Sequence, residues 1–498
     1  MPDADLGAEI LNLGRDFPPV PTEAWEAAIA KDLKGADYDK KLIWRTEEGL
    51  AVRPYYRNSA LAELGPQLRT APGHYPFARG TGLSWEIAQD AKPGPKAIRA
   101  DLFHEAGAHA IQELGYGIAA GVERLAELTA TLPVDTIAAQ IEFVFAVGPS
   151  YFIEIAKLRA ARILWAQVVA AFSPTDDGAC RMRLHVRTPL RNKSVYDRYT
   201  NLLRTTTEAL SAAVGGCDRL TVGSFGFDSH LALNLQRILK EESHIDAVAD
   251  PAGGSYYIEA LTDSLAREAW KLLQQVEAEG GYAAAMASGS ISKALAETRA
   301  ARAKAYSSRR RALVGVNNYP NVNEKTPEAE AEFPEADVAE AGLTRTGFHE
   351  AESAGPLPLV RIAEPFEKIR RRTTAQAQAT GRYPKVLLLT RGDVKMKGAR
   401  ANFCLNFFGC AGFDMVEAGE YEGSDADLIV LCSSDPEYLA LAQEVCTRVK
   451  VPVLVAGNPK EQMQALQAAG VQGFIHMMSD AIQTLTLWQD KLGMRSSQ

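Results

Sequence analysis

Short apolar runs recur through the last quarter of the chain, and the first four of them each precede a helical pattern or a turn. The runs are Val386–Leu389, Phe413–Val416, Leu428–Cys432, Val453–Val455 and Gly473–Ile475. Strands that alternate with helices predict a parallel, doubly wound sheet of about five strands, for which we expect the flavodoxin-like topology. Ligands of such sheets bind at the carboxyl ends of the strands, which makes the loop Arg391–Gly398 the candidate binding region.

Residues 73–317 show the same alternation, with longer helices. The candidate strands are Ser84–Gln89, Ala97–Phe103, Ile141–Val147, Met182–Arg187 and Arg219–Gly223. Between them, Ser150–Ala171 repeats apolar residues at helical intervals. The pattern predicts four or five parallel βα units, whereas a complete eight-unit barrel needs roughly 250 residues and more strands than this segment offers. We therefore predict a partial TIM-type (β/α) barrel.

Two further segments complete the predicted organisation. Residues 1–72 contain a helical pattern at Thr22–Lys34 and two candidate strands, Leu42–Thr46 and Leu50–Pro54. The segment 318–382 is poor in large apolar residues and rich in Glu, Ala, Pro and Thr, which is typical of a linker with at most one or two short helices. The expected domains are 1–72, 73–317 and 383–498, with 318–382 as the linker.

Composition and charge narrow the function classes. The 498-residue chain has a formal net charge of −8 and a pI near 5.7, which argues against nucleic acid or a membrane surface as a partner. The N-terminus M-P-D-A-D-L lacks the apolar core of a signal peptide, and no apolar run is long enough to span a membrane. The six cysteines form no C-x-x-C pair, so we expect buried thiols, a cytoplasmic protein and no metal site. We interpret the basic runs Arg309–Arg311 and Arg370–Arg372 as solvated helix faces.

Three segments together resemble the methylmalonyl-CoA mutase family. They are Asp250–Thr262 (D-P-A-G-G-S-Y-Y-I-E-A-L-T), Tyr151–Trp165 (Y-F-I-E-I-A-K-L-R-A-A-R-I-L-W) and Leu202–Gly216, with shorter matches at Tyr75–Gly80, Glu105–Ala108 and Val314–Asn317. The resemblance covers roughly residues 75–498, and the C-terminal part is similar to the family's cobalamin-binding domain. Within Asp250–Thr262 we expect a turn, a short strand and a helix that has Thr262 as its N-cap.

The resemblance implies a radical interconversion of methylmalonyl-CoA and succinyl-CoA that depends on adenosylcobalamin. In the family, the motif Asp-x-His-x-x-Gly supplies the imidazole below cobalt, and the matching residues here are Asp393, Lys395 and Gly398. A lysine is protonated at neutral pH and offers cobalt no lone pair. These three residues are therefore at most a vestigial cofactor loop, and an ordinary polar turn is the alternative.

The resemblance also locates the family's substrate and cofactor contacts in the main body, where several are replaced. Leu83 and Asp90 stand at the positions of an arginine and of a tyrosine that lies over the cofactor. Leu102 stands at the position of the histidine that hydrogen-bonds the thioester carbonyl, and His104, on the same face of the predicted strand, is a candidate substitute. The candidate substrate-binding residues are Tyr75, Arg79 and His185, with a structural role in the strand as the alternative for His185. We predict no catalytic residue in this chain.

These substitutions favour a non-catalytic small subunit of a heterodimeric methylmalonyl-CoA mutase, inactive by itself. The resemblance implies a large catalytic subunit as the partner, which binds the adenosylcobalamin, and residues 1–72 resemble an extension that wraps such a partner. Two alternatives remain open. One is an active acyl-CoA mutase with a different substrate and cobalamin-binding mode, and the other is a free-standing acyl-CoA or protein-binding module.

Overall fold

The computed structural model describes residues 18–64, 68–89, 94, 96–325, 344–345 and 357–494. The chain forms two compact units, Met1–Ala62 and Glu63–Gln498. Asp90 lies outside the described residues, as do residues 326–343 and 346–356 of the segment expected to be a linker.

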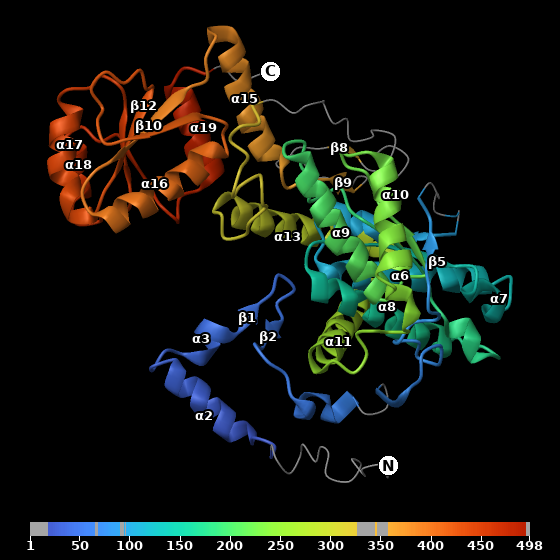
Figure 1. Cartoon of the computed structure of the whole chain (residues 1–498). Coiled ribbons are helices and arrows are strands. Elements are labelled where there is room, and N and C mark those ends of the chain that lie inside the picture. Colours follow the sequence, from blue (N-terminus) through green and yellow to red (C-terminus); the bar gives the residue numbers. More distant parts are fainter. Residues whose placement is uncertain are drawn as a thin grey trace, which may run out of the picture. The chain divides into compact units, whose positions relative to one another are not determined.

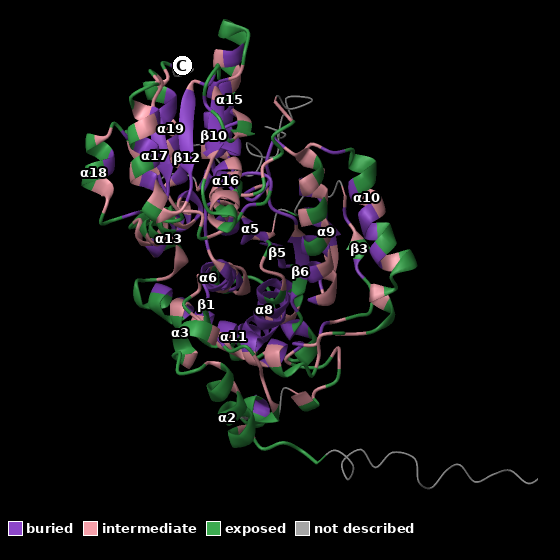
Figure 2. Ribbon diagram, turned by 60° about the vertical axis from the view of Figure 1, so that its left-hand side comes forward, coloured by how far each residue is buried: buried purple, intermediate pink, exposed green. Residues whose placement is uncertain are grey.

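The first unit exposes most of its apolar side chains. Its elements are α2 (Thr22–Asp32), α3 (Tyr38–Leu42), the antiparallel strands β1 (Trp44–Arg45) and β2 (Ala51–Val52), and most of the 3₁₀ helix η1 (Asn58–Leu64). The predicted helix and the predicted strand pair are both present, and the strands are shorter than expected. α2 buries none of its side chains, as Figure 2 shows, and its Trp25 stacks on Tyr55 with 4.7 Å between the ring centroids.

A five-stranded parallel sheet organises the main body of the second unit. Its strands are β3 (Glu86–Ile87), β4 (Ile98–Arg99), β5 (Glu142–Ala146), β6 (Arg183–Arg187) and β7 (Arg219–Thr221), in the order β3-β7-β6-β5-β4. Each of the five predicted segments contains a strand, and every neighbouring pair is parallel. Among the described residues, the edge strands β3 and β4 do not pair with each other, so this sheet is open.

The two faces of this sheet differ in character. Phe143 of β5 packs on Trp165 of α8 (Tyr151–Ala171), with ring centroids 4.7 Å apart, and leaves no room for a side chain at Gly121 of α6 (Ala110–Thr129). α11 (Tyr256–Ala278) packs on both of these helices. Because side chains alternate along a strand, the opposite face carries the charged and polar residues. These are Glu86, Arg99, Glu142, Arg183, His185, Arg187, Arg219 and Thr221.

Two local predictions in the main body are wrong. Residues 101–105 form a helix, α5 (Asp101–Glu105), where we expected the predicted strand 97–103 to continue. α11 begins after Ser255, whose hydroxyl accepts from the amide of Ile258, so no strand precedes it and Thr262 lies buried inside the helix. The aromatic and β-branched residues at 256–258 favour a strand locally, but packing of α11 on α6 and α8 overrides that preference. The remaining helices include α7 (Val134–Ala138), α9 (Arg198–Val214), α10 (Ser229–Arg237), α12 (Tyr282–Ala287) and α13 (Ser290–Ser307).

The C-terminal part contains a second five-stranded parallel sheet (Figure 1). Its strands are β10 (Lys385–Thr390), β11 (Asp414–Ala418), β12 (Leu428–Cys432), β13 (Val453–Ala456) and β14 (Gly473–Ile475), in the order β11-β10-β12-β13-β14. All five predicted strands are confirmed. The chain order is therefore 2-1-3-4-5, and the topological switch point lies where β10 meets β12.

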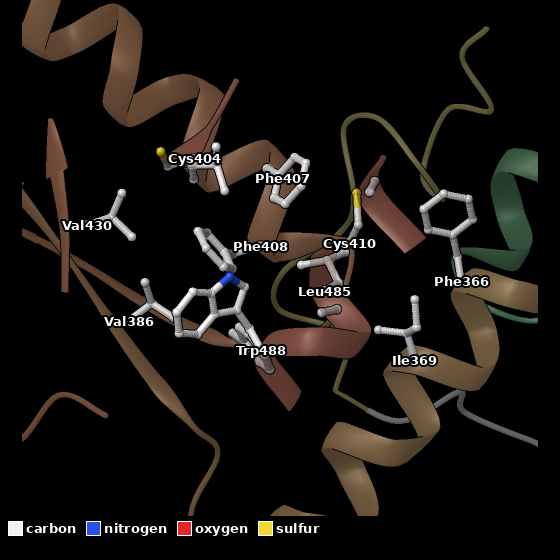
Figure 3. Packing of buried hydrophobic residues seen from close by; sticks show 14 of the residues in the cluster. Phe366, Ile369, Val386, Cys404, Phe407, Phe408, Cys410, Val430, Leu485 and Trp488 are labelled. Carbon is white, nitrogen blue, oxygen red and sulfur yellow. The ribbon is translucent and has the colours of Figure 1, made fainter. Parts of the chain in front are cut away.

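Helices cover both faces of this sheet. On one face, α16 (Val394–Gly409) and α19 (Ala481–Lys491) bury Phe407, Phe408 and Trp488 against alternate residues of β10 and β12, as Figure 3 shows. On the other face, α17 (Tyr438–Cys446) and α18 (Met463–Ala468) pack on the residues in between. Five of the six cysteines are buried and Cys446 is half-buried, which confirms the prediction of buried thiols.

Part of the predicted linker is structured. After the short strands β8 (Thr344–Arg345) and β9 (Pro358–Leu359), residues Glu364–Thr380 form the 17-residue helix α15, which packs Phe366 and Ile369 into the C-terminal core. We interpreted the basic run Arg370–Arg372 as a solvated helix face, and this is wrong for Arg370 and Arg372. Arg370 is buried with its guanidinium 4.1 Å from the ring centroid of Tyr196, and Arg372 is buried beside Asp490 at 2.6 Å. In the other basic run, Arg309–Arg311, the side chain of Arg309 also has a partner within the chain: it donates to the carbonyl of Asn317 at 3.0 Å.

Candidate functional site

Arg79 and Tyr75 lie beside a network of buried charges. Arg79 Nε donates to Asp250 Oδ2 at 3.0 Å, and the same carboxylate pairs with Arg159 of α8. Arg159 also pairs with Glu259 of α11 at 2.6 Å. This network joins the three sequence segments 75–80, 151–165 and 250–262, so Arg79 has a structural role, and its role in substrate binding stays a prediction. Tyr75 is 39% exposed and packs on Phe77.

His185 is a neutral residue within the sheet. Thr221 Oγ1 donates to the carbonyl of Ala88 at 2.7 Å, so its oxygen accepts from His185 Nε2 at 2.8 Å. Burial lowers the pKa of His185 to about 3, and the nearby Arg219, Arg187 and Arg99 lower it further. The structure thus brings His185 together with Thr221, and not with Tyr75 or Arg79. A neutral, fully buried imidazole at this position supports the alternative of a structural role.

His104 belongs to a buried ionic cluster that the sequence did not reveal. It lies in helix α5, so the expectation that it shares a strand face with Leu102 is wrong. Its Nδ1 is 3.2 Å from Glu113 Oε2, and Lys157 of α8 pairs with Glu113 at 2.7 Å and with Glu154 at 2.5 Å. Burial, together with the nearby Arg191 and Lys157, lowers the pKa of His104 well below its usual range. Its surroundings leave His104 no open side from which to reach a thioester.

The loop that follows β6 is closed by internal partners. The backbone amides of Leu190 and Arg191 donate to the two carboxylate oxygens of Glu105, at 2.7 and 3.0 Å. Burial raises the pKa of Glu105 to about 7 in spite of these hydrogen bonds. Lys193 in the same loop is fully buried and pairs with Glu208 of α9 at 2.7 Å. The carboxyl end of this sheet is therefore occupied by the chain's own ion pairs.

α8 carries the charged residues that sequence reasoning missed. Lys157, Arg159 and Arg162 are all buried in an otherwise apolar helix, and Arg162 donates to the carbonyl of Met182 at 2.9 Å and pairs with Asp218 at 3.1 Å. Lysine and arginine are rarely buried without a partner. Three cations within one apolar helical pattern were therefore the available signal for a buried ionic network.

The residues of the vestigial cofactor loop form the start of a helix. Asp393 is the N-cap of α16 and accepts from the amide of Met396 at 2.7 Å. Lys395 is exposed on the first turn of α16, and Gly398 lies within the helix. The loop that precedes α16 is therefore limited to residues 391–393, which agrees with the alternative of an ordinary polar turn.

The carboxylate of Glu437 occupies the switch point between β10 and β12. Glu437 Oε2 accepts from Ser434 Oγ at 2.5 Å, from Ser433 Oγ at 2.7 Å and from the amide of Asp393 at 3.2 Å. These hydrogen bonds, with those of Ser434 and Ser433 the strongest, lower the pKa of Glu437 to about 2. Gly392 has φ of 83°, and a Cβ there would lie 2.2 Å from Glu437 Oε2. Any side chain at position 392 would therefore displace this carboxylate.

The loop that follows β13 is also in contact with side chains of this chain. The guanidinium of Arg400 from α16 lies over Gly457, where a Cβ would meet it at 3.4 Å, and pairs with Asp435 at 3.1 Å. The hydroxyl of the buried Tyr438 donates to the carbonyl of Ala456 at 2.6 Å. The chain's own side chains thus fill the carboxyl ends of β10, β12 and β13.

The chain belongs to the methylmalonyl-CoA mutase family, whose profile matches residues 83–346. Its similarity is to the small subunits in particular. It is 32% identical to the methylmalonyl-CoA mutase small subunit of Porphyromonas gingivalis over 98% of this chain and 100% of that protein. It is 35% identical to the small subunit of Streptomyces virginiae over 86% of this chain and 70% of that protein. The methylmalonyl-CoA mutase of Cereibacter sphaeroides is 41% identical, but only over 47% of this chain and 35% of that protein.

The alignment with the Porphyromonas gingivalis protein has 637 positions, which exceeds the 498 residues of this chain by 139. The chain therefore lacks counterparts to many residues of a relative whose whole length it matches. Only residues 88–97 connect β3 to β4, although these strands form opposite edges of the sheet.

The residues at the C-terminal switch point do not fit a cobalamin. Lys395 offers no imidazole and is exposed on a helix, while Glu437 and Arg400 close the loops at this edge of the sheet through contacts with the chain's own residues. Among the described residues, no group of His, Cys, Asp or Glu is placed to hold a metal ion. None of the helices in the described ranges has the length and apolar character that crossing a membrane requires.

Proposed function

We propose that this chain is the non-catalytic small subunit of an adenosylcobalamin-dependent methylmalonyl-CoA mutase, which acts in the cytoplasm in propionate metabolism. Its partner would be the large, catalytic subunit, in a heterodimer in which that subunit holds the cofactor and the acyl-CoA. The observation that carries the proposal is the filling of both candidate sites by internal partners, Glu437 at the C-terminal sheet and Glu105 at the main sheet.

In this proposal the two sheets are remnants of a catalytic architecture. The open sheet of the main body, 73–317, would be a shortened TIM-type barrel, and the C-terminal domain, 383–498, would be a flavodoxin-like domain of the cobalamin-binding type. The strand order 2-1-3-4-5 supports the second assignment. Residues 318–382 would join the two domains, with α15 packed on the second.

We further propose that residues 1–72 form an arm that binds the large subunit. Trp44 and Trp25 in this region are 46% and 40% exposed, although tryptophan is usually buried in folded proteins. Exposed aromatic residues on a unit with so little core of its own are typical of a surface that becomes buried in an interface.

Expression of this chain alone and together with a large subunit that carries Asp-x-His-x-x-Gly tests the proposal. The chain alone should neither convert methylmalonyl-CoA nor change the visible spectrum of added adenosylcobalamin. The pair should purify with one copy of each chain and should be active. Turnover by the purified chain alone, supplied with adenosylcobalamin, would overturn the assignment.

A further inference from the structure

Two consecutive methionines lie in the turn that follows β14. Met477 is 82% exposed and Met478 is 64% exposed. The other methionines of the described residues are half-buried or buried; they are Met182, Met286, Met396, Met415, Met463 and Met494. Because the flexible thioether side chain usually fills gaps in a core, two neighbouring thioethers in solvent set this turn apart from the rest of the chain.

Hydrogen bonds within the chain hold this turn in place. The amide of Ser479 donates to the carbonyl of His476 at 2.9 Å, and Ser479 Oγ accepts from the amide of His476 at 3.0 Å. The amide of Met478 donates to Nδ1 of His476 at 3.1 Å. Directly after the turn, Asp480 is the N-cap of α19 and accepts from Ser307 Oγ of α13 at 2.5 Å. The two thioethers are therefore exposed in the folded chain, without any local unfolding.

The thiols of the chain compete poorly for an oxidant. Cysteine reacts as the thiolate, so both deprotonation and access are required. Five of the six cysteines are buried and Cys446 is half-buried. Burial raises the pKa of Cys446 and raises the pKa of Cys410 to about 12, so both thiols are protonated at neutral pH. A thioether needs no deprotonation, and its reactivity follows its exposure.

We propose that Met477 and Met478 form a site of reversible oxidation by hydroperoxides. The thioether sulfur attacks one oxygen of the peroxide, so a sulfur–oxygen bond forms and the oxygen–oxygen bond breaks. Sulfur is oxidised by two electrons, and the peroxide is reduced by the same two. With hydrogen peroxide, the departing hydroxide takes the proton of the transferred oxygen and leaves as water. Methionine sulfoxide reductases reverse the reaction, in which two thiols become a disulfide and the oxygen leaves as water.

Oxidation changes the character of the turn and leaves the core as it is. Each sulfoxide is polar, whereas each thioether is apolar. Because Met477 and Met478 are exposed, the added oxygen atoms displace no packed side chain. The surface beside the carboxyl end of β14 therefore becomes polar while the fold is retained. The site is independent of the subunit role proposed above, because its residues belong to this chain and its reactant is a small molecule.

Limited oxidation of the full-length chain tests the site. The chain is treated with hydrogen peroxide at neutral pH, catalase stops the reaction, and peptide mass spectrometry measures the added oxygen at each methionine and cysteine. Met477 and Met478 should react about tenfold faster or more than the buried Met182 and Met494, and before Cys446. In urea, where all side chains are solvated, the methionines should react at similar rates.

The double variant Met477→Leu, Met478→Leu is the matched control, because leucine keeps the turn apolar and carries no sulfur. It should lose the fast reaction and keep the slow ones. The proposal is wrong if Met477 and Met478 react no faster than the half-buried Met286 and Met463, if Cys446 reacts first, or if the same preference persists in urea. It is also wrong if reductases for both sulfoxide epimers fail to restore the two thioethers. Because the experiment needs no large subunit, its failure would not bear on the proposed subunit role.

Discussion

His185 shows how a histidine is held neutral inside the main sheet by burial and a hydrogen bond. Its Nε2 donates to Thr221, and its Nδ1 lies 4.0 Å from Glu142 Oε2, too far for a hydrogen bond. The imidazole is buried next to arginines, so protonation would place a further positive charge beside Arg219 and Arg187 without water to screen it.

Replacing His185 by glutamine should make the protein less sensitive to acid. The pKa of His185 is about 3 in the folded chain and about 6.5 when solvated, so below pH 6.5 only the unfolded chain takes up this proton. The stability that the neutral histidine contributes is therefore present above pH 6.5 and is lost as the pH falls toward 3. Between pH 7 and pH 5, wild type should lose about 2 kcal/mol more than His185→Gln. Urea denaturation of both proteins at pH 7, 6 and 5 measures this difference, and parallel pH profiles would contradict it.

For single residues, the sequence predicted properties that depend on the type of side chain. It did not predict contacts between residues that are far apart in the sequence. The absence of an imidazole in the loop after β10 was evident from Lys395 alone. The closure of that loop by Glu437 was not, because Glu437 accepts from the amide of Asp393, 44 positions away, and these residues meet only when β10 and β12 pair. The N-cap role of Asp393 follows from local backbone geometry, which is why a polar turn could be predicted there.

Among the elements, α8 combines an apolar composition with buried charge. Lys157 lies between Glu113 and Glu154, and its ammonium also donates to the carbonyl of Ala146 at 2.6 Å. Burial raises the pKa of both carboxyls, while the two carboxylates raise the pKa of Lys157. Lys157 therefore stays protonated, and its contacts link α8 to α6 and β5.

Lys157→Met should destabilise the chain by about 3–5 kcal/mol, because it leaves two buried carboxyl groups without their cation. The measurement is the free energy of unfolding by chemical denaturation. Lys271→Met is a matched control, since Lys271 of α11 pairs with Glu268 at 2.7 Å but is 64% exposed. Such surface pairs contribute about 0–1 kcal/mol. Equal losses in the two variants would show that burial of the Lys157 cluster is energetically unimportant.

Helices and strands whose own sequence pattern is strong were predicted, and those that depend on contacts with distant residues were not. Strands β10 to β14 were predictable because each is a short apolar run between glycine- or proline-rich turns, and central strands of a parallel sheet are apolar on both faces. α15 was missed because its composition is polar: besides Phe366 and Ile369, several of the residues that it buries are charged or polar, such as Arg370 and Arg372. α5 was missed because its five residues follow directly on the two-residue strand β4.

On the scale of the whole molecule, the chain combines a well-packed second unit with a first unit that lacks a substantial core. Of the side chains described in residues 18–62, only Thr46, Val52 and Leu61 are buried. A unit of about 60 residues usually needs a compact core or an additional source of stability. The proposed large subunit would supply that stability by covering the exposed tryptophans.

Trp44→Ala should weaken association with the large subunit at least tenfold and leave the isolated chain nearly as stable as before. Trp44 is 46% exposed on the edge of a two-stranded ribbon, so its truncation removes little internal packing. Tryptophans that become buried in an interface commonly contribute about 2 kcal/mol or more to binding. The dissociation constant of the pair, measured by surface-immobilised binding, reports the loss.

The control for this variant is Leu487→Ala, which truncates a side chain of α19 that is 49% exposed and lies outside the proposed arm. It should leave the dissociation constant unchanged. If Leu487→Ala weakens association while Trp44→Ala does not, the large subunit binds the C-terminal domain, and the exposed tryptophans of the first unit require another partner. If neither variant changes the affinity, the interface must lie on the main body, where β3 and β4 are the edges of the sheet in the described part of the chain.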